Sequence, residues 1–166
     1  NDRSIDEVGK LAGKKIAVFD YDKSQSQLVQ RVGAQAVPSD VSNFGQKFNN
    51  GVVDIIAAPA TAYRPLELYR GLGTKGGIPD FVLAQVFLQV VIRKERFPDG
   101  YGQQSRQYLS SQFDRVLAIV QRYESDINPK YWLHIPDTDR PRYFALMRSA
   151  RIDLTKNGTY DKRMMS

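Results

Sequence analysis

Two carboxylates flank a tyrosine in the segment "DYD", where Asp20, Tyr21 and Asp22 follow the apolar run "KKIAVF". If that run is a strand of an open α/β sheet, its end is where such sheets place ligand-binding loops. The two carboxylates could then bind a divalent metal or carry out acid-base chemistry. They could also cap the following helix and hydrogen-bond the turn, and we favour this second interpretation.

Other catalytic groups are scarce in the chain. It has no cysteine and a single histidine, His134, which excludes disulfides, thiolate metal sites and His-based metal clusters. The stretch "YWLHIP" indicates a partly buried aromatic turn with a structural histidine. There is no G-x-S-x-G motif, and "GLGTKGG" lacks the spacing of a phosphate loop, so we interpret it as a hinge or crossover. We therefore expect no catalytic residue, no metal, no cofactor and no enzymatic activity.

Composition indicates a globular chain. The 166 residues suffice for one domain, and 42% of them are hydrophobic and 25% charged. The net charge of +6 favours anionic partners, but its densest piece, "RKER" at 93–96, lacks interleaved aromatic residues and is typical of a solvent-exposed strand end, so we expect no nucleic-acid partner. No apolar run reaches the roughly 18 residues of a membrane span. The chain begins at Asn1 without a signal peptide, as we would expect of a processed or truncated product.

The elements that position these residues alternate between helices and strands. In the first half we predict, in order, a short helix closed by Gly13, a strand over 14–19, a helix ending at Gly33, a strand at "QAVP", a helix with Val41, Phe44 and Phe48 on one face, and a strong strand at "VVDIIAA". This alternation implies βαβ units, and therefore an α/β fold with a largely parallel sheet covered by helices on both faces.

The second half is predicted to be more helical. "PATAYRPLELYRGL" predicts a helix with Pro59 in its first turn, and "GTKGGIPD" predicts a flexible loop. "FVLAQVFLQVVIRK" favours a strand, although its length leaves a helix open. Residues 103–125 predict one long amphipathic helix, and one more helix and a polar tail follow. We divide the chain into an α/β lobe over 1–132 and a C-terminal helix and tail over 133–166, which either completes this lobe or packs on a missing one.

Small residues end the predicted strand "VVDIIAA". Because the ends of parallel strands face the ligand crevice, Ala57, Ala58 and Pro59 should line one wall and residues 20–22 another. Such a site has room for a ligand and offers it no nucleophile or acid, which is typical of a receptor.

Four segments, in order, resemble the second lobe of the solute-binding proteins of TRAP transporters. They are "LAGKKIAV", "VGAQAVP", "FNNGVVD" and an "AP" pair, which are similar to that family's L-x-G-x-K-[IL]-R-V opening, its G-A-x-x-x-P segment, and a [TN]-[GN]-x-V-D segment followed by a polar residue and proline. The resemblance is clear over about residues 8–63 and only architectural beyond them.

The resemblance implies an α/β fold, namely a periplasmic-binding-protein type II-like lobe with a mostly parallel sheet flanked by helices. It also implies a periplasmic, extracytoplasmic receptor of two lobes that close on a small-molecule solute, usually an organic acid, and deliver it to membrane permease subunits. This chain would supply about half of such a protein, with the other half before Asn1. We expect a monomer or weak oligomer.

Two positions depart from the family pattern. Ala17 stands where the family has an arginine that pairs with the ligand carboxylate, and Ala58 stands where it has an asparagine before proline. Either Lys, Arg or Gln residues elsewhere replace this anchor, or the ligand is more apolar, or the domain has ceased to transport.

Three hypotheses follow. The first is a non-enzymatic solute-binding lobe with a ligand-binding crevice lined by Ala17, Asp20, Tyr21, Val41, Ala58, Pro59 and Tyr63. The alternative is a protein-interaction module that retains the binding-protein fold without transport and uses the arginines of "DRPRYFALMRSAR". The third is an enzyme that uses Asp20 and Asp22 with a divalent metal.

Overall fold

A computed structural model of the chain describes residues 2–83 and 90–164. Its strands are β1 (Lys15–Phe19), β2 (Gln35–Ser39), β3 (Ile78–Pro79) and β4 (Trp132–Leu133). Its α-helices are α1 (Lys23–Arg31), α2 (Phe44–Asn49), α3 (Tyr69–Leu72), α4 (Tyr101–Ser111), α5 (Phe113–Ser125) and α6 (Arg140–Lys156). Short 3₁₀ helices cover Val8–Leu11, Ala60–Ala62, Lys94–Arg96, Pro129–Tyr131 and Lys162–Met164.

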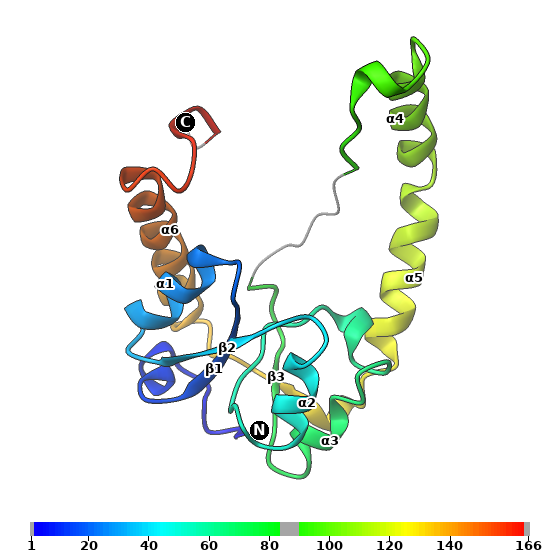
Figure 1. The fold of residues 1–166 in the computed structure, drawn as a ribbon. Coiled ribbons are helices and arrows are strands. Elements are labelled where there is room, and N and C mark those ends of the chain that lie inside the picture. Colours follow the sequence, from blue (N-terminus) through cyan, green and yellow to red (C-terminus); the bar gives the residue numbers. More distant parts are fainter. Residues whose placement is uncertain (1, 84–89, 165–166) are drawn as a thin grey trace.

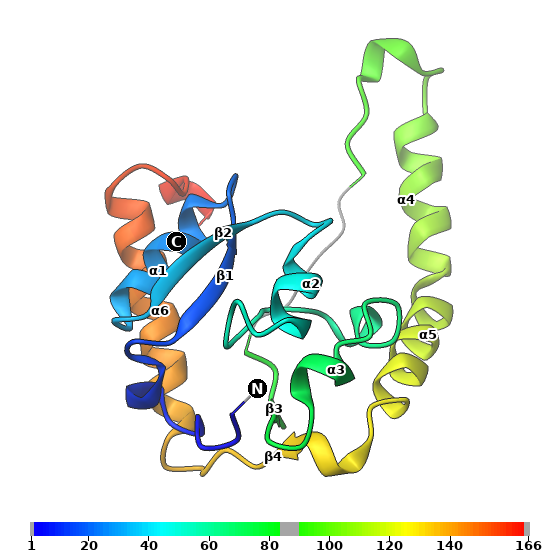
Figure 2. The same ribbon diagram turned by 60° about the horizontal axis from the view of Figure 1, so that its bottom comes forward.

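The first strand pair is parallel, as predicted. β1 and β2 pair in register from Lys15 opposite Gln35 to Phe19 opposite Ser39. Helices α1 and α6 lie on one side of this pair, and α2 and α3 lie on the other (Figures 1 and 2). Ile16, Ala17 and Val18 are therefore all buried, since helices cover both faces of the strand. The predicted α/β fold with a parallel sheet flanked by helices is confirmed, although the strands form two short parallel sheets, β1–β2 and β3–β4.

The strand predicted at "VVDIIAA" is wrong in its extent. Ile55 forms a single parallel bridge with Ile16, through N–H···O=C bonds of 3.1 Å from Ala17 to Ile55 and from Ile55 to Lys15. Just before the bridge, the Asp54 carboxylate accepts a hydrogen bond from the Lys15 backbone N–H at 2.9 Å, so a side chain takes a donor that a longer ladder would use. The segment still lies beside β1, and it leads into the exposed residues 57–59.

Helix α1 begins with a side-chain cap. The Asp22 carboxylate accepts a hydrogen bond from the Gln25 backbone N–H at 3.0 Å, which satisfies one of the free donors of the first turn. The helix ends just before Gly33, whose φ of +71° is the left-handed conformation that favours glycine. Val29 then packs with Ile16 and Val18 in a small apolar cluster behind the sheet. The capping interpretation is confirmed for Asp22.

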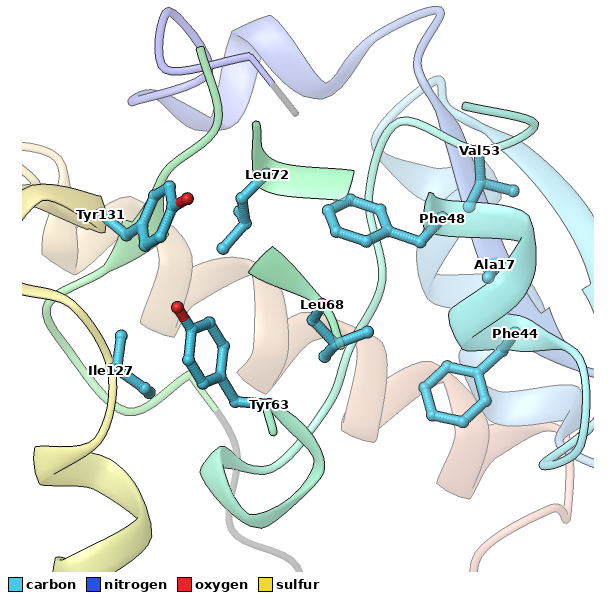
Figure 3. Close-up of a cluster of buried hydrophobic side chains, with 9 residues drawn as sticks. All are labelled: Ala17, Phe44, Phe48, Val53, Tyr63, Leu68, Leu72, Ile127 and Tyr131. Atoms are coloured by element: carbon cyan, nitrogen blue, oxygen red, sulfur yellow. The ribbon is translucent and has the colours of Figure 1, made fainter. Parts of the chain in front are cut away.

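The main core lies on the other face of the sheet. Its nine buried residues come from β1, α2, α3 and the segments around them, and Figure 3 shows them as one continuous cluster: Ala17, Phe44, Phe48, Val53, Tyr63, Leu68, Leu72, Ile127 and Tyr131. Gly71 permits the close packing of α3 on α2, because a Cβ at this position would come within 2.4 Å of the Phe48 ring. This cluster packs α2 against β1 and α3 against α2.

The C-terminal helix lies against α1 on the opposite face. Arg31 of α1 pairs with Asp153 and donates a hydrogen bond to Ser149, both on α6, and Asn157 donates to Gln27. The helix predicted in this part of the chain is present. The division of the chain at residue 132 stays a prediction.

The long helix predicted over 103–125 is two helices, α4 and α5, that meet at Gln112. The Ser111 hydroxyl donates a hydrogen bond to the Tyr108 carbonyl at 2.7 Å, and the Gln112 N–H is shared between the carbonyls of Tyr108 and Leu109. Such local bonds compete with the helical ladder. The two helices form an arm that extends away from the body of the protein (Figure 1). Helix α5 contacts the 3₁₀ helix Ala60–Ala62.

Three other predicted elements differ from the structure. The first predicted helix is a 3₁₀ turn, Val8–Leu11. The helix predicted from Pro59 is interrupted between Ala62 and Tyr69, in a segment that contains Pro65 and a positive φ of 50° at Glu67. The strand favoured over 81–94 falls mainly on residues 84–89, which lie outside the described residues, and neither 81–83 nor 90–93 forms a strand or helix.

Candidate functional site

The candidate site lies at the carboxyl ends of β1 and β2. The chain leaves β1 in a tight turn, closed by a hydrogen bond from the Asp22 N–H to the Phe19 carbonyl at 2.9 Å. The Asp20 N–H donates to the carbonyl of Ser39, the last residue of β2, at 3.1 Å. The Gln25 side chain accepts a hydrogen bond from the Phe19 N–H at 2.7 Å. Residues 19–22 are thus held in place by both neighbouring elements.

Aromatic rings cover this edge. The rings of Phe19 and Tyr21 are stacked, with centroids 5.4 Å apart and planes 3° apart, and Phe44 meets Phe19 edge-on at 5.5 Å. Phe44 belongs to the core, whereas the Tyr21 side chain is 71% exposed. The three rings therefore lead from the buried cluster out to solvent.

The aspartates at this edge have different roles. Asp22 caps α1. Asp40 accepts hydrogen bonds from the Ser42 backbone at 2.7 Å and from the Ser42 hydroxyl and the Asn43 side chain, and the Ser42 hydroxyl is the main cause that lowers the pKa of Asp40. Asp20 is exposed, and within residues 2–83 and 90–164 its carboxylate has no hydrogen-bond or ion-pair partner. In the same part of the chain no group of three His, Cys, Asp or Glu side chains could hold a metal ion.

Ala17 is one of two predicted site residues that lie inside the core. It is 5% exposed and packs in the cluster that contains Phe44, Phe48 and Val53. An arginine here would place its charge among apolar side chains. Ala17 thus forms the apolar floor next to Phe19.

Tyr63 is the other buried member, also at 5% exposure. Its ring meets those of Tyr69 and Tyr131 at centroid distances of 6.0 and 6.4 Å, in tilted, edge-on geometries. Burial raises the pKa of the Tyr63 phenol. Tyr63 and Ala17 belong to the same buried cluster but lie on opposite sides of it, Tyr63 near Ile127 and Tyr131 and Ala17 near Phe44 and Val53 (Figure 3).

The remaining predicted site residues are exposed. Val41 is 64% exposed in the turn before α2, not on the helix face where the sequence pattern put it. Ala58 and Pro59 are exposed in the segment between the Ile55 bridge and the 3₁₀ helix Ala60–Ala62. The role of all seven residues in ligand binding stays a prediction.

Sequence reasoning missed Phe19 and Phe44 as residues of this edge. The signal was available for Phe19, because Ala17, Phe19 and Tyr21 are two residues apart, and alternate residues of a strand share one face. Phe44 was predicted on one face of a helix with Val41 and Phe48, but its contact with Phe19 depends on how α2 packs on β1.

The histidine lies away from this edge. His134 Nδ1 is 2.7 Å from Asp80 Oδ2, and Asp80 Oδ1 also accepts hydrogen bonds from Arg140 at 3.2 Å and from the Ile135 N–H at 3.3 Å. The His134 hydrogen bond is the main cause that lowers the pKa of Asp80. The stretch around His134 is partly buried, as predicted, with Tyr131 and Ile135 buried, but the His134 side chain itself is 70% exposed. The group joins β3, β4 and the start of α6.

The exposed "RKER" segment is not a strand end. Its last three residues form the 3₁₀ helix Lys94–Arg96, and all four are exposed.

Among the described helices, none combines the length and the apolar character needed to cross a membrane.

The fold is that of the periplasmic solute-binding proteins of TRAP transporters. The chain superposes on the ectoine-binding protein of the TeaABC TRAP transporter of Halomonas elongata with a TM-score of 0.67 and 10% sequence identity, over 93% of this chain and 53% of that one. It also superposes on a TRAP periplasmic solute-binding protein of Desulfovibrio salexigens, solved with bound orotic acid, with a TM-score of 0.58 and 14% identity, over 97% of this chain and 54% of that one.

The sequence comparisons give the family. The family model described as "Solute-binding protein AdeT 1/2" matches residues 1–166, and the chain belongs to this family. It is 53% identical over all its 166 residues to the probable solute-binding protein AdeT1 of Acinetobacter baumannii, of which it covers 55%. It is 25% identical over 159 residues to the probable solute-binding protein AdeT2 of the same organism, covering 96% of this chain and 67% of AdeT2. The chain thus spans about half to two thirds of the length of these relatives.

Proposed function

We propose that this chain forms one lobe of an extracytoplasmic receptor that captures a small molecule and presents it to the membrane subunits of a transporter. The observation that carries the proposal is the position of the aromatic edge at the carboxyl ends of two parallel strands, in a chain of a solute-binding family. In open α/β sheets this is where ligands bind. The receptor works in the periplasm and is not an enzyme.

The chemistry of this edge supports binding rather than catalysis. Asp22 and Asp40 are occupied by backbone and side-chain donors, and His134 pairs with Asp80 elsewhere in the fold. The exposed residues 57–59 bring only methyl groups and a pyrrolidine ring. A ligand placed here would be held by rings, a carboxylate and apolar walls, without a nucleophile beside it.

The arm formed by α4 and α5 supports a second lobe. Its large apolar side chains are between 37% and 65% exposed, namely Tyr101, Tyr108, Leu109, Phe113, Val116, Leu117, Ile119 and Val120. An amphipathic helix normally buries such a face. The AdeT1 relative has nearly twice the length of this chain, so the second lobe of a full-length receptor would supply the surface that covers the arm.

The ligand then lies between the two lobes and stabilises the closed arrangement by contacting both. On this lobe we assign the contact surface to Ala17, Asp20, Tyr21, Val41, Ala58, Pro59 and Tyr63, with Phe19 and Phe44 added. Ala17 and Tyr63 are both buried, so they support the residues of the contact surface and do not form its outer layer.

The test is native mass spectrometry of the full-length protein purified from its own host. We expect a defined extra mass from a retained small molecule, and a rise in melting temperature when that molecule is added back to stripped protein. An empty protein that shows no thermal shift with a broad metabolite panel, and that carries a second polypeptide instead, would overturn the proposal.

A further inference from the structure

The two charged side chains of the turn that follows β1, Asp20 and Asp22, are both acidic. Asp20 follows β1 directly, and in the described part of the chain nothing pairs with its carboxylate. Tyr21 is the next residue, and both side chains are exposed in the same short turn after β1. The edge therefore combines an unpaired negative charge with an exposed ring.

We propose that the ligand of this site carries a positive charge, as an organic ammonium or amidinium group, and binds between the Asp20 carboxylate and the ring of Tyr21. The inference rests on the proposed function, since it names the class of solute that the receptor takes. An exposed carboxylate attracts a cation, and the face of a tyrosine ring adds a cation–π contact.

The stacked pair makes the ring a fixed wall. One face of Tyr21 lies parallel to Phe19, and Phe19 is in turn held edge-on by the buried Phe44. A ring held in this way loses little conformational freedom when a ligand covers its outer face. The exposed position of Tyr21 leaves that face open.

The nearby basic residues do not reverse the sign of the site. Lys47 donates hydrogen bonds to the Pro38 carbonyl and the Ser39 hydroxyl, so its ammonium is directed at the end of β2. Lys23 is exposed in the first turn of α1, where Asp20 and Asp22 outnumber it.

The middle of β1 brings no charge to this edge. Ala17 brings a methyl group, buried among Phe44, Phe48 and Val53. A ligand carboxylate at this edge would find no guanidinium on β1 and would approach Asp20, and like charges at close range repel. The same arrangement favours a cation with an apolar body, whose charged end meets Asp20 while its body covers the rings.

The test uses three probes of similar size in isothermal titration calorimetry with the full-length protein: benzylammonium, benzyl alcohol and benzoate. We expect benzylammonium to bind about tenfold more tightly than the neutral alcohol, and benzoate to bind most weakly. If benzoate binds most tightly, the proposal of a positively charged ligand is wrong, while the proposed receptor function still stands. No binding of any probe, together with no retained small molecule in the native mass spectrum, would overturn both.

Variants locate the charge. Asp20→Asn should weaken benzylammonium by about tenfold and leave benzyl alcohol unchanged, and Tyr21→Leu should weaken benzylammonium severalfold while Tyr21→Phe retains it. Asp114→Asn, the same substitution at an exposed carboxylate on α5, is the matched control and should change nothing. If Asp20→Asn and Asp114→Asn bind benzylammonium equally well, the assignment to this site is wrong.

Discussion

The rings of Phe19 and Tyr21 are stacked, with an interplanar angle of 3° and a centroid distance of 5.4 Å. Phe19 nevertheless belongs to the sheet, whereas Tyr21 is exposed to solvent. Phe19 is the last residue of β1 and packs on the core residue Phe44, whereas Tyr21 is 71% exposed in the turn. The pair thus joins the part of the fold that gives stability to the part that meets a ligand. Stability and binding should therefore respond differently to substitution along this row of rings.

Truncation of the rings should separate the two properties. Tyr21→Ala removes an exposed ring and should lower the free energy of unfolding by less than about 1 kcal/mol. Phe44→Ala leaves a cavity beside Ala17 and Phe48 and should cost about 3 to 5 kcal/mol. Urea unfolding of the two variants checks this, and similar losses in both would mean that Tyr21 is part of the core.

The buried position of Ala17 makes a charge there costly. Ala17→Arg would place an unpaired guanidinium among Phe44, Phe48 and Val53, and should destabilise the fold by roughly 3 to 5 kcal/mol. Ala58→Arg is the matched control, because Ala58 is exposed and the same side chain there should change the stability by less than about 0.5 kcal/mol. Equal melting temperatures for the two variants would show that the β1 position opens to solvent.

Substitution of Asp22 and of Asp20 should change the free energy of unfolding by different amounts. Asp22→Ala removes the acceptor of the Gln25 N–H and should cost about 1 kcal/mol, since the first turn of α1 loses its cap. Asp20→Ala removes an exposed carboxylate with no partner in the described part of the chain, so its free energy of unfolding should stay within about 0.5 kcal/mol of the parent. Chemical denaturation of both variants decides it, and a larger loss for Asp20→Ala would reverse the assigned roles.

These cases also show how far the sequence predicts this fold. The strand over 14–19, the helix capped by Asp22 and the stop at Gly33 depend on neighbouring residues, and their patterns were read correctly. The strand at 52–58 depends on distant partners, and pairing there is limited to one bridge while Asp54 takes the Lys15 N–H. The candidate site shows the same difference. The place of Asp20 and Tyr21 directly after a strand was predicted correctly, whereas their role in ligand binding stays a prediction, and the burial of Tyr63 against Tyr131 depends on a contact between distant segments.

The Asp80 group predicts a pH dependence of stability. The pKa of Asp80 is lowered in the folded protein, mainly by the His134 hydrogen bond, so the folded state binds the proton less tightly than the unfolded chain. The contribution of Asp80 is then fully present above about pH 4 and is lost as the pH falls through the folded pKa. Asp80→Asn should be less stable than the parent at pH 7, and the difference should shrink as the pH is lowered below about 4.

Thermal unfolding of both proteins between pH 7 and pH 3 tests this expectation. Asp99→Asn, an exposed carboxylate on the loop before α4, serves as the control and should follow the parent at every pH. A stability difference for Asp80→Asn that stays constant with pH would show that the loss is one of packing, not of charge.

The exposed arm gives the sharpest test of the two-lobe arrangement. Phe113 on α5 is 64% exposed in this lobe, and a second lobe that covers the arm would bury it. In the full-length protein Phe113→Ser should therefore cost about 1.5 to 3 kcal/mol, the amount by which burial stabilises a large apolar side chain. Phe144→Ser is the matched control, since Phe144 is 56% exposed on α6, away from the arm, and its loss should be well under 1 kcal/mol. Denaturant unfolding of the two variants decides between the alternatives, because an arm that stays in solvent would make both substitutions equally mild.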